Sequence, residues 1–213
     1  AEPKFSILDG NDDDPVVSVL FDWPHLYLQS GLADNEMGSF MRAMHRGITQ
    51  DRMKHSCTYV NFGAYAERWK LPQSVSPFTH LLDREHSARF IEKGVFPSTA
   101  SELLALIPIL RRFLKTVIEP EVRDTPLHDH VRSMIACLEV VMLCQRTRRK
   151  GAVDPTIFEQ AIARHLELFK RVYGEQEVKS KHHYAMHLVL FLSIYGCLLS
   201  CFVHERKHRA CVS

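Results

Sequence analysis

Apolar residues follow a helical spacing through most of the chain. The first such stretch is predicted to begin at Asp34 and to stop at Gly47. Its apolar positions, three and four residues apart, are Met37, Phe40, Met41 and Met44. Two weaker helices are predicted over 57–70 and 81–93, the first ending before Pro72. The chain from here on is therefore expected to be mainly α.

Three stronger helices are predicted in the middle of the chain. The first begins at the capping-box spacing of Thr99 and Glu102, and its stripe of Leu and Ile runs to Pro120. The other two span 126–150 and 154–174, and each is opened by a helix-starting Pro or Asp-Pro and closed by Gly. Three consecutive amphipathic helices predict a helical bundle or array.

The N-terminal segment has a different pattern. Residues 9–15, DGNDDDP, combine turn formers with consecutive acids and predict a solvated loop. The apolar, β-branched run 16–21 then predicts a short strand, with Asp22 at its C-terminal end. An Asp at that place could equally cap a turn before Trp23-Pro24.

The C-terminal segment is nearly continuous in apolar residues from Tyr184 to Val203. Its length is sufficient to span a membrane, so a membrane-anchored helix is one interpretation. His187 and Gly196 inside the run favour the other interpretation, two buried helices broken near Gly196, and a membrane partner is considered unlikely on this evidence.

These patterns predict a mainly α fold with a short N-terminal β element. Its parts are an acidic leader (1–15), a strand and turn (16–33), a helical domain (34–178) and C-terminal apolar helices with the HERKH motif (179–213).

Composition supports a packed domain and narrows its surroundings. The 213 residues are 46% hydrophobic and 24% charged, which excludes disorder over most of the length. A net charge of +2 gives no general reason to bind nucleic acid, so a basic surface would be local. The six cysteines form no C-x-x-C pair and no signal-peptide pattern opens the chain, which predicts a reducing intracellular compartment. A chain beginning at Ala1 is expected to be a fragment of something longer.

The clearest local motif is H-E-x-x-H at 204–208. On a helix this spacing puts His204 and His208 on one face as zinc ligands, with Glu205 as a general base. The third ligand of such sites normally lies downstream, where only 209–213 remain. A zinc site at this motif is therefore a minor alternative.

Three short segments give a second interpretation of the same residues. Together, FDWPHLYLQSGLADNE at 21–36, KHHYAMHL at 181–188 and FVHERKHR at 202–209 resemble eukaryotic DDE-type DNA transposases that have an RNase H-like core and a helical insertion domain. In that family a strand-end Asp opens a D-x-x-H element and the last catalytic acid lies on a helix. Asp22, His25 and Glu205 match those places.

The resemblance implies a function and a site. Asp22 and Glu205 would be catalytic and would hold Mg²⁺ or Mn²⁺, with His25, His204 and His208 in support. DNA would be the partner, the nucleus the location, and a homo-oligomer is possible in such a family. Possible contacts to DNA phosphates are Arg146, Arg148, Arg149, Lys150, Arg206 and Lys207.

The resemblance also has a gap. A DDE triad needs another Asp on an earlier strand, and before Asp22 there are acids only in the loop 9–15 and at Glu2. The missing acid would belong to a core segment of a longer chain, so this fragment alone is expected to be inactive. The rival hypothesis is a non-catalytic soluble helical interaction module.

Overall fold

The computed structural model describes residues 22–28, 30–50, 59–71 and 98–200. This part is mainly helical, as predicted, and β-strands are absent from these ranges. The predicted strand 16–21 and the predicted helix 81–93 lie outside the described residues. The helical elements are α2 (Trp23–Tyr27), α3 (Leu32–Gln50), α4 (Tyr59–Ala66), α7 (Ala100–Phe113), a π-helical turn η2 (Leu114–Ile118), α8 (Glu119–Val122), α9 (Leu127–Arg146), α10 (Pro155–Tyr173), a 3₁₀ turn η3 (Glu175–Glu177) and α11 (Ser180–Tyr195).

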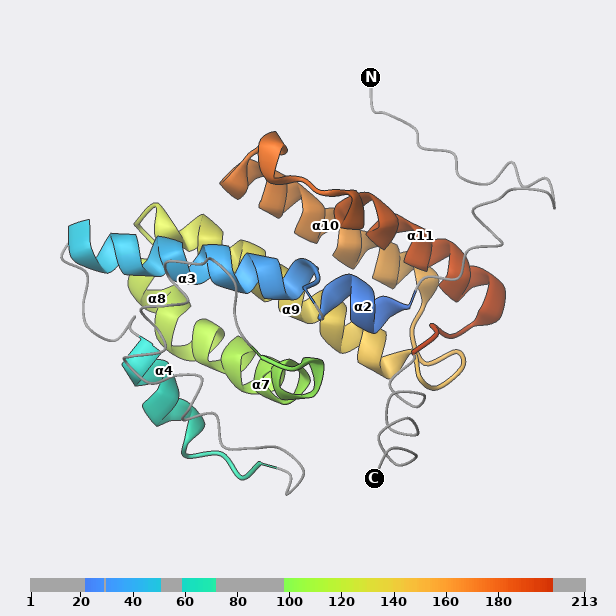
Figure 1. The fold of residues 1–213 in the computed structure, drawn as a ribbon, viewed down its shortest axis with the longest axis horizontal. Helices are drawn as coiled ribbons and strands as arrows, with labels where there is room; N and C mark the ends of the chain where they lie inside the picture. Colours follow the sequence, from blue (N-terminus) through green and yellow to red (C-terminus); the bar gives the residue numbers. More distant parts are fainter. Residues whose placement is uncertain (1–21, 29, 51–58, 72–97, 201–213) are drawn as a thin grey trace.

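Helix α9 is the centre of the array (Figure 1). It packs against α10 on one side and against α7 and α8 on the other, and α3 lies along it. Helix α11 packs on α10 and on the short α2, which itself contacts α3. Segments from both ends of the described chain are thus in contact with each other.

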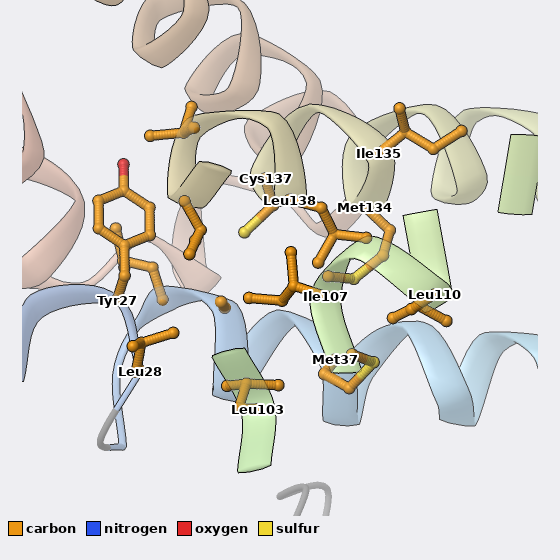
Figure 2. Close-up of a cluster of buried hydrophobic side chains, with 14 of the residues drawn as sticks. Tyr27, Leu28, Met37, Leu103, Ile107, Leu110, Met134, Ile135, Cys137 and Leu138 are labelled. Carbon is orange, nitrogen blue, oxygen red and sulfur yellow. The ribbon is translucent and has the colours of Figure 1, made fainter. Parts of the chain in front are cut away.

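The core is the surface that α3, α7 and α9 share. Figure 2 shows its apolar side chains meeting between these helices, with the Tyr27 ring at one end. Its fully buried members include Met37, Leu103, Ile107, Met134 and Leu138, each 0% exposed. Full burial of each such side chain stabilises the fold by about 1.5–3 kcal/mol. All five belong to the predicted apolar stripes.

Local capping signals set several helix ends where the sequence predicts them. Thr99 and Glu102 form the predicted capping box, with both reciprocal hydrogen bonds present. The Asp154 carboxylate accepts hydrogen bonds from the Thr156 and Ile157 amides at 2.7 and 3.3 Å. At the other end of α10, Gly174 adopts φ 89°, ψ 162°, a conformation that only glycine reaches without strain.

Two predicted helix ends are wrong. Helix α3 continues through Gly47 to Gln50, because an isolated glycine lowers helix stability without preventing the helix. The helical path after Phe113 also continues through Pro120 to Val122, by way of the π-helical turn. Proline lacks an N–H and its ring crowds the carbonyl four residues back, and a wider π-helical turn directly before it relieves both problems.

The C-terminal apolar run breaks where predicted. Helix α11 ends at Gly196, which takes the left-handed conformation with φ 69°. Residues 197–200 are not helical, and the remainder of the predicted second helix lies outside the described residues. Among the described helices, none is both long and apolar enough to cross a membrane.

Candidate functional site

The D-x-x-H element forms the start of a helix. Asp22 is the N-cap of α2: its carboxylate accepts a hydrogen bond from the His25 amide at 3.3 Å and also contacts Nδ1 of the His25 ring. Its backbone is extended, with φ −80° and ψ 111°. The capping role predicted as an alternative is therefore present, and residues 23–27, where a turn was expected, form the short helix α2.

The first turn of α11 lies against this element. Lys181 Nζ donates to the carbonyl oxygens of His25 and Ser30, both at 2.9 Å. Lys179 Nζ also reaches Oδ1 of Asn35 at 3.4 Å. Two of the three segments that carry the transposase resemblance, 21–36 and 181–188, are thus adjacent although far apart in the sequence.

Histidines follow on the same turn of α11. His183 and His187 share one face, as their spacing predicts, and their Nε2 atoms are 3.2 Å apart. His182 instead points into the protein, where its ring lies 4.4 Å from that of Phe169. Its Nδ1 accepts a hydrogen bond from the Lys179 amide at 2.9 Å. Burial, followed by the nearby His165, lowers the pKa of His182, so it stays neutral.

The predicted basic contacts are partly described. Arg146 ends α9, and Arg148, Arg149 and Lys150 follow it on an exposed turn. The Gly151 amide donates to the Gly196 carbonyl oxygen at 2.9 Å, which holds this basic turn beside the end of α11. Four cationic side chains are therefore displayed close to where the C-terminal segment begins.

The remaining predicted site residues are not placed by the structure. Glu205, His204, His208, Arg206 and Lys207 all lie outside the described residues. Convergence of Asp22 with Glu205, which a two-metal site requires, therefore stays a prediction.

A different site, which the sequence analysis missed, lies inside the bundle. Glu36 of α3, Ser133 and Cys137 of α9 and His165 of α10 are all 0% exposed. Ser133 Oγ donates to Oε1 of Glu36 at 2.6 Å, and Nε2 of His165 lies 2.6 Å from Oε2. Glu36, Cys137 and His165 each offer one potential ligand atom, and these three atoms lie within 4.8 Å of one another. We call these four residues the buried polar cluster.

Aromatic hydroxyls surround the buried polar cluster. Tyr27 packs against His165 with ring centroids 6.4 Å apart, and Tyr173 lies within the same aromatic layer through Phe169. Burial, and then neighbouring Cys144, Cys137 and Glu36, raise the pKa of Tyr27. Burial and then Glu36 likewise raise the pKa of the Cys137 thiol. At neutral pH both groups hold their protons.

Polar atoms here also lack partners. Among the described residues, Oη of Tyr27, Oη of Tyr173 and Nδ1 of His165 are buried with no hydrogen-bond partner. More than about nine in ten buried polar groups in proteins have one, including partners among ordered waters. These atoms therefore mark positions at which a water or an ion can be expected.

A sequence signal for this site exists in retrospect. Glu36 is four residues before Phe40, within the apolar stripe of α3, and His165 is between Ile162 and Phe169 on that of α10. A polar residue at a stripe position is buried when the stripe is, and must then find a polar partner. The partners, however, come from helices far away in the sequence.

The two sites differ in what they can do chemically. The D-x-x-H element has a partly exposed carboxylate, 20% accessible, that a solvated ion or a nucleic acid could reach. The buried polar cluster is closed to any large substrate and could hold only a proton, a water or an ion. No family model, curated protein or solved structure matches the chain in comparisons with known proteins.

Proposed function

We propose that the chain is part of a DDE-type DNA transposase, contributing Asp22 and Glu205 to its catalytic centre and the helical domain that separates them in sequence. The observation that supports this most is the pairing of the D-x-x-H element with the start of α11 through Lys181. The resemblance rests on segments from both ends of the chain, and such a family requires those ends to meet. Segments 21–36 and 181–188 are in contact, and residues 202–209 lie outside the described residues.

The intervening helices fit the same proposal. An inserted helical domain has to leave and return to a core at nearby points. Here α2 and α11 contact each other, so the segments that precede and follow the intervening helices lie side by side (Figure 1). The helical domain would thus leave the core and return to it at one place, and its basic turn at 146–150 would meet DNA phosphates without reading the base sequence.

The proposal assigns metal binding to Asp22 and Glu205. The Asp22 carboxylate is a hard oxygen ligand, it is partly exposed, and the His25 amide orients it, which fits Mg²⁺ or Mn²⁺. Such an ion, when bound, would activate water and then a DNA 3′-hydroxyl for in-line attack on phosphate. The chain's own task is to orient Asp22 and Glu205 and to hold the DNA backbone. The third acid would come from a core segment of the longer chain, so this chain alone should not cut DNA.

Iron-directed cleavage tests the proposal. Fe²⁺ can replace Mg²⁺ at carboxylate sites, and with added hydrogen peroxide it generates hydroxyl radicals that cut the polypeptide beside the ion, while ascorbate returns the iron to Fe²⁺. We expect cuts both near Asp22 and near Glu205, suppressed by excess Mg²⁺. Both sets of cuts should disappear in Asp22→Asn and in Glu205→Gln.

The matched control is Asp129→Asn. Asp129 is another accessible acid that already pairs with Arg171 at 3.2 Å, and removing it should leave the cuts unchanged. Cuts that survive both site variants, or that occur near only one of the two acids, would contradict a shared metal site and favour the non-catalytic interaction module.

A further inference from the structure

The buried polar cluster combines three kinds of metal-ligating side chain in one enclosed place. A carboxylate from α3, a thiol from α9 and an imidazole from α10 converge, and each residue is 0% exposed. The three helices are held together by extensive packing around them. Such a set is preorganised, because no ligand has to be brought in from solvent.

Charge is compatible with a bound dication at this place. Unpaired buried charges are strongly unfavourable. Two positive charges, a carboxylate, a thiolate and a neutral imidazole sum to zero, so a dication held by these three side chains leaves no net charge in the interior.

The geometry requires only a small adjustment. Zinc binds sulfur at about 2.3 Å and nitrogen or oxygen at about 2.0–2.2 Å in a tetrahedron, so its ligand atoms lie roughly 3.3–3.7 Å apart. The Glu36–His165 contact at 2.6 Å would have to open, and the other separations, which are within 4.8 Å, would have to settle into this range. Ser133 Oγ, now on the Glu36 carboxylate, or a water is available for the fourth position.

We propose that Glu36, Cys137 and His165 form a structural zinc site that ties α3, α9 and α10 together. The mixed sulfur, nitrogen and oxygen donors suit zinc, whereas Mg²⁺ prefers oxygen alone. On binding, a Zn–S bond forms as the Cys137 S–H bond breaks, and that proton leaves to solvent. A proton shared by Glu36 and His165 is displaced likewise. This site is independent of the proposed transposase function.

Metal analysis of the full chain tests this. We would express it with zinc in the medium, remove loosely bound metal by desalting, and measure zinc by elemental analysis. About one zinc per chain is expected from the charge and ligand set. Cys137→Ser should lose it. Cys144→Ser is the matched control, because Cys144 is equally buried on the same helix, and it should keep the zinc.

Two double variants separate this site from the other histidine pairs. His183→Ala with His187→Ala, and His204→Ala with His208→Ala, should both keep the zinc. Loss of zinc in either one, with retention in Cys137→Ser, would overturn the proposal. Loss in the second would assign the metal to the H-E-x-x-H motif instead.

Cobalt substitution keeps the proposal testable if Cys137→Ser folds poorly. Co²⁺ loaded into the unmodified chain and into Cys144→Ser should give a thiolate-to-cobalt charge-transfer absorption. Absence of zinc from the unmodified chain, or cobalt bound without that absorption, would show that Ser133, Glu36 and His165 are simply a hydrogen-bonded network.

Discussion

His182 shows how a single residue can make stability depend on pH. It lies beside Phe169 at the edge of the aromatic layer, 5% exposed, and its Nδ1 already accepts the Lys179 amide proton. Burial disfavours the charged form of the ring, and the nearby His165 adds to this effect. Both lower the pKa of His182 and favour the neutral ring.

The sign of the pH dependence follows from this. His182 has an ordinary pKa of 6.5 when unfolded and a lower one when folded. As the pH falls below 6.5, the unfolded state binds the proton first, so the free energy of unfolding decreases until the folded pKa is passed. His130, whose pKa burial also lowers, acts in the same direction.

Urea unfolding from about pH 7.5 to 5.5 would measure this effect. We expect His182→Gln to reduce the loss of stability on acidification without abolishing it, since His130 remains. The control is His128→Gln. His128 is a partly exposed histidine two residues before His130 on α9, and its substitution should leave the pH dependence of the stability intact. An unchanged pH dependence in His182→Gln would contradict the argument.

At the scale of one helix, α10 depends on its cap. Asp154→Ala leaves two amides of the first turn without their acceptor and should lower the free energy of unfolding by about 1 kcal/mol. Thermal or urea unfolding would measure the change. Glu159→Ala, an exposed substitution one turn later on the same helix, should change the stability much less. If both substitutions lowered the free energy of unfolding by the same amount, the hydrogen bonds of the Asp154 cap would not contribute specifically to the stability of α10.

Between helices, Glu139 connects α9 to the α7–η2 segment. Its carboxylate accepts from Arg111 at 2.7 Å and from Lys115 at 3.0 Å. Burial alone would raise the pKa of Glu139, but these two hydrogen bonds and charges lower it. Lys115 lies on the π-helical turn, so the wider turn is held against α9 by charge as well as by packing.

Neutralising that carboxylate should therefore weaken the packing between these elements. We expect Glu139→Gln to lower the free energy of unfolding by about 0.5–1 kcal/mol, with a larger effect at low salt. Glu175→Gln, which removes the exposed pair with Lys170, should have a smaller effect. Stability that is insensitive to Glu139→Gln at low salt would contradict this role.

At the scale of the whole molecule, the sequence predicted what local signals determine. Thr99, Asp154 and Gly196 act through hydrogen bonds and backbone conformation within a few residues of themselves, so their helix ends could be read directly. The helix ends predicted from Gly47 and Pro120 were wrong, because an isolated glycine does not by itself stop a helix and a π-helical turn accommodates the proline.

The candidate sites were harder to predict for a related reason. The spacing of Asp22 and His25 is local, and the structure indeed brings them together. The partners of Glu36 are not local: Ser133 and His165 lie 97 and 129 residues further on. Periodicity shows that such a residue faces inward, but only the tertiary fold shows what it meets there.

Those sequence separations also affect how the chain folds. Helices α9 and α10 are joined by a short connection and can pair early, whereas α3 must close a loop of about a hundred residues before Glu36 reaches them. Contacts of such long range are generally formed late, because the loop entropy is lost before the contact is gained. Weakening Glu36 should then accelerate unfolding far more than it slows folding. The buried polar cluster would form after the neighbouring helices have assembled, and its contacts would then set the unfolding rate, and so the lifetime, of the native state.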